Sequence, residues 1–341
     1  MLFRNSIKLL MENFKNVYKI LLYKFIVGLV AGALCAALIL PELVELLASP
    51  QWQKVVTDVK SFFSAFFAAN ATALEEVKNA MFGENGSLYA LAQMVLSKMT
   101  AIVLTTVGCV LIYLLKRFAE TLCYFSVGSI LNDKMSTYAE TSFGTAYVSN
   151  AGKASRYALV YVPVVFLFDL LTVAMIVLLM TTVNIIPALF FSVTLLVLMQ
   201  SVKLTFTGVW LPAMTTDGKK LRNAFAYKKT EKKQLPKIFA TYIVTVYLVI
   251  IVNIVAAVCT FGSALIVTVP AAYMVFICEQ FVNYYTIKGK KYFITFDRIA
   301  SNPDCGDREH IFEYIDETAL DPTVAISTER NAEEKTQETQ E

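Results

Sequence analysis

Six runs of mostly apolar residues constrain this 341-residue chain more than any other feature of its sequence. A helix needs roughly 20 apolar residues to cross the hydrocarbon of a bilayer. The runs cover residues 21–40, 91–115, 157–180, 185–203, 238–259 and 263–286. Because 57% of the residues are hydrophobic and only 17% are charged, one water-facing globule could not bury these side chains. The sequence therefore predicts an all-α, polytopic bundle of six transmembrane helices.

Basic residues in the loops predict the orientation of these spans, because Lys and Arg resist translocation. Segments 1–24, 116–156 and 215–237 hold five, five and eight basic residues, whereas 41–90 holds three Lys against six carboxylates. We expect both termini to be cytoplasmic and segment 41–90 to face outward. Residues 25–40 could also serve as the core of a cleaved signal peptide, but the even number of spans favours an uncleaved anchor.

Two segments that flank the first span have helical patterns. Residues 1–20 place apolar side chains at alternating steps of four and three, with basic side chains on the other side. This pattern predicts an amphipathic interfacial helix in the cytoplasmic headgroup layer, or else a helix packed against the bundle. The outward segment 41–90 has an apolar stripe between Val55 and Phe67 and is expected to be partly helical, as a cap on the bundle or on the outer leaflet.

The cytoplasmic loop 215–237 and the tail 292–341 carry opposite charges. Eight basic residues in the loop face only Asp217 and Glu231, and such a cluster attracts anionic lipid headgroups. The candidate lipid contacts are Lys219, Lys220, Arg222, Lys228, Lys229, Lys232, Lys233 and Lys237. The alternative is that these charges only fix the topology. The tail has 13 acids against four basic residues and is expected to be disordered from about residue 325.

Ionisable residues inside the spans are the candidates for a site, because a charge left in lipid costs at least a few kcal/mol. Asp169 lies near the middle of the third span, where it would be a proton or cation site or a structural, hydrogen-bonded carboxyl. The polar residues expected to assist it are Thr105, Thr106 and Asn253. Lys203 and Glu279 lie in the inner third of their spans and are predicted to form an interhelical ion pair.

Motifs for catalysis and metal binding are missing from the sequence. The single histidine, His310, falls in the tail, and no P-loop, GxGxxG, HExxH or GxSxG occurs. The six cysteines are scattered, and no nucleic-acid recognition motif accompanies the basic loop. We expect no enzyme activity, no cofactor, no metal centre and no nucleic-acid partner.

A resemblance to known membrane proteins rests on a stretch before the fifth span. It reads Trp210-Leu211-Pro212-Ala213-Met214-Thr215-Thr216-Asp217-Gly218-Lys219, followed by Asn223-Ala224-Phe225. In this stretch the chain resembles a loose group of polytopic membrane proteins of Gram-positive bacteria. That group is similar to the membrane domain that accompanies some glycerophosphodiester phosphodiesterases. The resemblance covers about residues 116–291 and implies a bacterial plasma membrane. It transfers no catalytic residue, because a catalytic barrel of about 250 residues cannot fit in the tail.

Two functions remain open at the level of sequence. The first is a non-catalytic integral membrane protein that acts as a scaffold, sensor or envelope-assembly accessory. Its partners would be the bilayer, with anionic headgroups at the cytoplasmic face, and a membrane protein or a second copy of the chain. The alternative is a small-molecule or proton-coupled transporter with Asp169 in its path.

Overall fold

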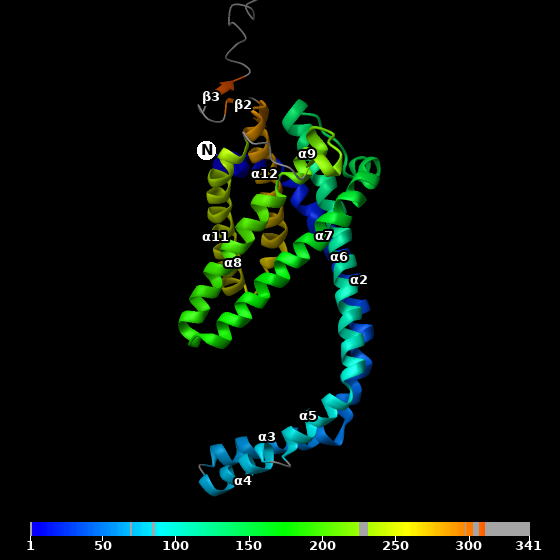
Figure 1. Cartoon of the computed structure of the whole chain (residues 1–341), viewed down its shortest axis with the longest axis vertical. Helices are drawn as coiled ribbons and strands as arrows, with labels where there is room; N and C mark the ends of the chain where they lie inside the picture. The colour runs from blue at the N-terminus through cyan, green and yellow to red at the C-terminus, as the bar shows by residue number, and fades with distance from the viewer. Residues whose placement is uncertain are drawn as a thin grey trace, which may run out of the picture. The chain divides into compact units, whose positions relative to one another are not determined.

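The structure is a computed structural model that describes residues 2–68, 70–83, 86–224, 231–296, 298–302 and 307–310. Helices dominate these residues (Figure 1). They are α1 (Leu2–Glu12), α2 (Lys15–Ala48), α3 (Pro50–Phe67), α4 (Ala71–Phe82), α5 (Ser87–Ser97), α6 (Met99–Thr137), α7 (Phe143–Thr182), α8 (Ile185–Thr207), α9 (Trp210–Thr216), α10 (Leu221–Ala224), α11 (Leu235–Cys259) and α12 (Leu265–Lys288). A short 3-10 helix, η1 (Glu231–Gln234), precedes α11.

Six helical segments among the described residues are long and apolar enough to cross a membrane. They are α2, α6, α7, the continuous stretch Ile185–Thr216 that contains α8 and α9, α11 and α12. Lipid offers no hydrogen-bond partner to the backbone, so a crossing segment forms its backbone hydrogen bonds within helices. The chain is therefore a multi-pass membrane protein, as predicted from its apolar runs.

Several helices extend well beyond the apolar runs. Helix α2 begins at Lys15 and continues through Pro41 to Ala48, and α7 begins at Phe143, 14 residues before the predicted span. Charged residues end a run of high hydropathy, but Lys, Glu and Ala are good helix formers and do not end the helix. The predicted second span, 91–115, is divided in the structure, because α5 ends before Lys98 and α6 begins after it.

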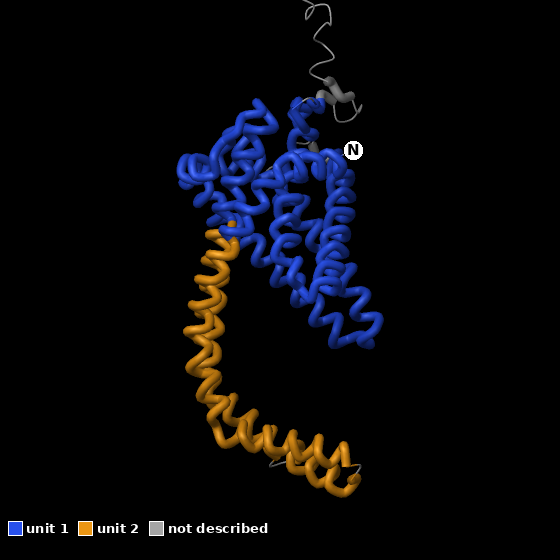
Figure 2. Tube along the Cα trace, turned by 180° about the vertical axis from the view of Figure 1, so that it is seen from behind, with its two compact units in different colours: residues 1–23, 121–341 blue, residues 24–120 orange. Residues whose placement is uncertain are grey.

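The chain divides into two compact units (Figure 2). Unit 1 comprises Met1–Tyr23 and Thr121–Glu341, and unit 2 comprises Lys24–Glu120. In unit 1, α8 packs against both α7 and α11, while α12 packs against α1, α9 and α11. Every residue of α12 from Ile277 to Thr286 is buried, so this half of α12 is the centre of the unit.

Helix α1 packs against α12 and β1, and its buried side includes Leu2, Leu9 and Leu10. Residues 1–20 were expected either in the headgroup layer or packed against the bundle. In the structure, α1 packs against the bundle. The amphipathic segment is also shorter than predicted. It breaks at Asn13, whose side-chain amide donates to the Leu9 carbonyl at 2.9 Å, before α2 begins at Lys15.

A small antiparallel sheet follows α12 in the order β1-β2-β3, a feature that the sequence did not predict. Its strands are β1 (Tyr292–Thr295), β2 (Arg298–Asn302) and β3 (Asp307–His310). Helix α12 is followed by Gly289, whose left-handed backbone (φ +61°) is open mainly to glycine and turns the chain toward β1. The disorder predicted from about residue 325 concerns residues outside the described ranges.

Unit 2 contains the segment predicted to face outward as three helices, α3, α4 and α5, which pack against one another. Ser49 caps α3 by accepting a hydrogen bond from the Trp52 amide at 3.2 Å, and Asn70 caps α4 through the Ala73 amide at 3.2 Å. Lys98 forms an ion pair with Glu45, which joins the end of α2 to the start of α6.

Gly208 lies where α8, α11 and α12 meet, and replacing it should destabilise unit 1. A Cβ atom at Gly208 would lie 2.5 Å from the Tyr242 hydroxyl and 2.6 Å from the Leu204 carbonyl oxygen. We expect Gly208→Ala to cost about 1–3 kcal/mol of stability, as overpacking generally does. Thermal unfolding in detergent measures the effect. Gly152→Ala is the matched control, because no atom lies within 4 Å of its Cβ position, and an unchanged melting temperature in Gly208→Ala would contradict the packing.

Candidate functional site

The candidate intramembrane site is built by the hairpin of α7 and α8. Asp169 is in α7, and its Oδ1 atom accepts hydrogen bonds from Lys203 Nζ at 2.7 Å and Gln200 Nε2 at 3.3 Å, both from α8. The Lys203 side chain is only 11% exposed and that of Asp169 is 26% exposed. Two charges that neither helix could leave in hydrocarbon therefore compensate each other, and their ion pair ties α7 to α8.

The ion pair predicted between Lys203 and Glu279 is not formed. Lys203 contacts Asp169 instead, while Glu279 is 0% exposed within unit 1. Similar depth in the membrane suggested the pair, but depth does not determine which way a residue faces around its helix. Lys203 points toward the neighbouring helix of its own hairpin.

The polar residues expected beside Asp169 have other contacts. Asn253 in α11 donates to the Val249 carbonyl at 2.8 Å and accepts from the Thr268 hydroxyl of α12 at 2.8 Å, so it connects α11 with α12. Thr105 and Thr106 belong to unit 2, where Thr106 donates to the Ile102 carbonyl at 2.7 Å. Within unit 1, Asn253 thus contacts α12 and not Asp169, and a role for Thr105 and Thr106 beside Asp169 stays a prediction.

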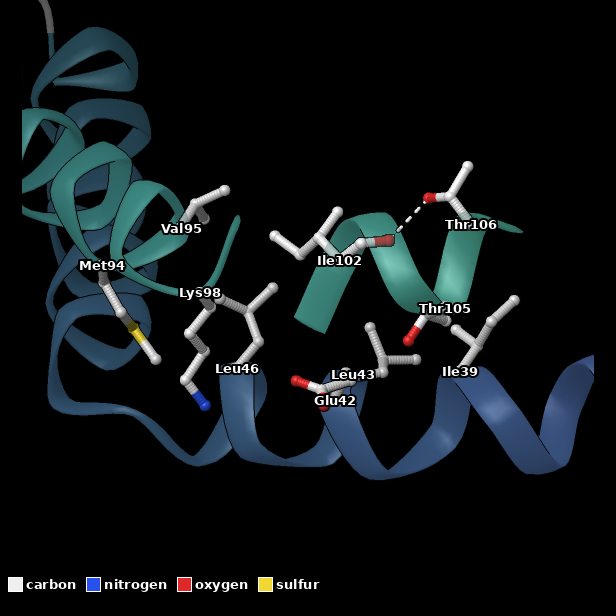
Figure 3. Close-up of a pocket in the computed structure, with 10 residues that line it drawn as sticks. All are labelled: Ile39, Glu42, Leu43, Leu46, Met94, Val95, Lys98, Ile102, Thr105 and Thr106. Atoms are coloured by element: carbon white, nitrogen blue, oxygen red, sulfur yellow. Dashed lines mark hydrogen bonds between the residues drawn. The ribbon is translucent and has the colours of Figure 1, made fainter. Parts of the chain in front are cut away.

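Thr105 and Thr106 line a pocket of about 260 Å³ in unit 2 (Figure 3). Its other lining residues come from α2, α5, α6 and the Lys98 junction: Ile39, Glu42, Leu43, Leu46, Met94, Val95, Lys98 and Ile102. Figure 3 shows the Lys98 side chain beside Leu46 and the two threonines at the other end of the lining. The lining is mainly aliphatic, which suits an apolar chain better than a polar substrate.

A polar cluster that the sequence analysis did not select is centred on Asp217, directly after α9. Its carboxylate accepts hydrogen bonds from the Tyr284 hydroxyl at 2.5 Å and from Lys290 Nζ at 2.7 Å, and Lys219 Nζ lies at 3.2 Å. Burial tends to raise the pKa of Asp217, but the hydrogen bonds from Lys290, Tyr284 and Lys219 outweigh it and lower the pKa to about 2. The sequence signal for this cluster was the Asp217-Gly218 pair. Gly218 has φ +59° and reverses the chain after Asp217.

Further side-chain contacts connect other helix ends of unit 1 near the Asp217 cluster. Asn132 of α6 accepts hydrogen bonds from Thr216 at 2.7 Å and Tyr285 at 3.1 Å. Farther along α6, Lys134 lies 3.6 Å from Glu12, and the Tyr138 hydroxyl donates to the same carboxylate at 2.7 Å. The ends of α1, α6, α9 and α12 are thereby joined through side chains.

The predicted lipid contacts fall into three groups. Lys219 is engaged with Asp217 and Tyr284, at 3.2 and 3.4 Å. The exposed basic residues are Lys220, Arg222, Lys233 and Lys237. Lys228 and Lys229 lie outside the described residues, as does the side chain of Lys232. Within the described ranges, no group of three or more His, Cys, Asp or Glu side chains could hold a metal ion.

Comparison with known proteins finds no family, no curated protein and no solved structure that matches this chain. The resemblance carried by Trp210–Lys219 therefore stays a prediction.

Breaking the Asp169–Lys203 pair should destabilise the α7–α8 hairpin. Asp169→Asn or Lys203→Met leaves one charge without its counterion, and we expect each to cost about 1.5–3 kcal/mol. The double variant Asp169→Leu/Lys203→Met removes both charges and should recover most of the loss. Thermal unfolding in detergent measures all three proteins. A double variant no more stable than the single variants would show that the pair is not the unit of stabilisation.

The Asp217 cluster should make unfolding sensitive to acid. Because the folded pKa, about 2, lies below the ordinary value of 3.8, the stability from Asp217 is present above 3.8 and is lost as the pH falls toward 2. Asp217→Asn should have a lower melting temperature at neutral pH and a weaker pH dependence over that window. Glu140→Gln is the control, because its partner Lys15 and Glu140 itself are both exposed, so their pair contributes little. Equal pH profiles for the parent and Asp217→Asn would contradict the assignment.

Proposed function

We propose that the chain is a non-catalytic scaffold of a bacterial plasma membrane, with both termini in the cytoplasm, that gathers anionic lipid at its cytoplasmic face. The observation that carries the proposal is the division of basic residues around α9 and α11. Asp217 binds Lys219 and Lys290, whereas Lys220, Arg222 and Lys233 are exposed. Three exposed cations beside membrane-spanning helices attract anionic headgroups by about 1 kcal/mol each near the surface.

The contacts of Asp217, which fix the backbone beside these cations, support a scaffold role. The turn that precedes Lys220 is fixed by the Asp217 contacts with Tyr284 and Lys290, so Lys220 and Arg222 follow an ordered turn. An ordered cationic surface loses less conformational entropy on binding than a free loop. The partner beyond lipid, a second membrane protein or another copy of this chain, stays a prediction.

The alternative, a proton-coupled transporter with Asp169 in its path, is less well supported. A carboxylate that binds and releases a coupling ion must change its charge, and Lys203 at 2.7 Å already compensates Asp169. Proton flux in proteoliposomes separates the two functions. Flux in the parent that is lost in Asp169→Asn at matched insertion would favour the transporter, and no flux in either would favour the scaffold.

Neutralising the exposed cations should weaken the preference for anionic lipid. The parent and Lys220→Gln/Arg222→Gln/Lys233→Gln would be placed in nanodiscs of phosphatidylglycerol and phosphatidylcholine, with one lipid brominated. Quenching of Trp210 fluorescence, in a Trp52→Phe background, reports which lipid lies beside α9. We expect the preference for phosphatidylglycerol to fall about fivefold for each charge removed, at low salt.

The matched control removes three exposed cations from the outward segment: Lys54→Gln/Lys60→Gln/Lys78→Gln. It changes the net charge by the same amount and should leave the quenching preference unchanged. An equal loss in both triple variants, or no loss in either, would contradict a lipid site at the cytoplasmic face.

A further inference from the structure

A stripe of buried polar side chains runs along the central helix α12. Glu279, Asn283 and Thr286 follow one another at steps of four and three residues, so they share one helix face. They are 0%, 3% and 7% exposed. Among the residues that the structure describes, no hydrogen-bond partner reaches Glu279 Oε1 or Oε2, Asn283 Nδ2 or Oδ1, or Thr286 Oγ1.

Five such atoms on one face of one helix require an occupant. Buried polar groups in proteins almost always have a partner, either protein or ordered water, and lipid offers none. The stripe contains amide donors as well as oxygen acceptors, and Glu279 is its only carboxyl group. Water can both donate and accept, and a buried water typically makes about three hydrogen bonds, so water fits this set better than a metal ion.

At its Thr286 end, the stripe lies next to polar side chains on the proposed cytoplasmic side of unit 1. Thr286 lies beside Tyr292 of β1, whose hydroxyl accepts a hydrogen bond from Asn5 of α1 at 3.0 Å. From Thr286 to Glu279 is seven residues, or about 10 Å along the helix axis. Four waters at ordinary hydrogen-bond spacings of about 2.8 Å would cover that length.

The other end of the stripe is closed. Thr245 of α11 lies beside Glu279, but its hydroxyl donates to the Thr241 carbonyl at 3.1 Å. Beyond Glu279, α12 continues with the buried apolar residues Val275 and Met274. The polar side chains next to Glu279 along α12 therefore lie on one side of it, toward Thr286 and Tyr292.

The ionisable groups that the structure describes around Glu279 do not form an ion pair with it, so its carboxyl group is the one left to bind a proton. Among the ionisable side chains of α1 and α11, which pack against α12, only Tyr242 is buried, and α9 has none. On α12 itself, Cys278 is adjacent to Glu279, Tyr273, Tyr284 and Tyr285 lie farther along, and Lys288 is in the last turn. Helix α6 contacts α12 through Tyr124 and Asn132, and its ionisable residues at that end are Asp133 and Lys134. Lys203 of α8 is held by Asp169.

We infer that the Glu279 carboxyl binds a proton reversibly from the cytoplasm, through a chain of ordered waters along Asn283 and Thr286. A cytoplasmic hydronium ion gives up a proton to the chain and becomes water, and the last water of the chain passes a proton to the Glu279 carboxylate. The carboxyl returns the proton by the same route, because the outward side is apolar. The site therefore senses cytoplasmic pH without carrying protons across the membrane, and it does not depend on the lipid-binding role.

Infrared difference spectra of the full chain in nanodiscs, between alkaline and acidic pH, test this assignment. The C=O stretching band of a protonated carboxyl should appear on acidification, vanish in Glu279→Gln and persist in Asp169→Asn. In D₂O the band shifts as the proton exchanges. We expect Asn283→Leu to slow that shift about tenfold, which corresponds to 1.4 kcal/mol of added barrier. Asn253→Leu, the same substitution in α11, should not slow it.

Three results would overturn the proposal. They are a titrating band that survives Glu279→Gln, a Glu279 band that does not change with pH, and equal exchange rates in Asn283→Leu and Asn253→Leu. If Glu279→Gln fails to fold, Asn283→Leu and Thr286→Val still decide the question, because both retain the carboxyl and alter only the route to it.

Discussion

The need to satisfy every backbone and side-chain polar group without water governs the six spans. Long helices satisfy the backbone, and hydroxyl side chains bond the carbonyl four residues earlier, as Thr172, Ser201 and Thr205 do at 2.7–2.8 Å. Groups that cannot be satisfied within one helix are paired between helices, as Asp169 with Lys203 and Asn253 with Thr268. Against this background, the Glu279 face of α12 stands apart, because five polar atoms without a protein partner in the described part of the chain lie together on it. That concentration is the reason for placing a chain of waters there.

The number and approximate position of the spans could be predicted from hydropathy, because the bilayer sets the length of a crossing helix. The helix ends could not be predicted from hydropathy, because residues such as Lys15 and Ala48 can be helical inside or outside the hydrocarbon. The sheet after Gly289 was missed for a different reason. Its strands have four or five residues, too short for alternation to be distinguished from chance.

Side-chain pairing was the weakest part of the sequence prediction. Asp169 lies 14 residues before the turn at Val183, and Lys203 lies 20 residues after it, so a hairpin register would have placed them within reach of a long lysine side chain. Depth alone instead suggested Glu279, which lies on another helix and faces the centre of the unit. The unpartnered state of Glu279 had no signal in the sequence, because it depends on what surrounds α12 on every side.

The Asp217 cluster changes what the charge of the 215–237 loop means. Counting residues gives eight cations against two carboxylates, which overstates the charge available to lipid. Lys219 and, from beyond the sixth span, Lys290 are bound by Asp217, whose charge also holds the Tyr284 hydroxyl. One acidic residue thus converts part of a basic loop into a fixed support and separates it from the exposed cations that follow. A charge cluster next to a membrane has a structural part and an interacting part, and only the contacts of each residue distinguish them.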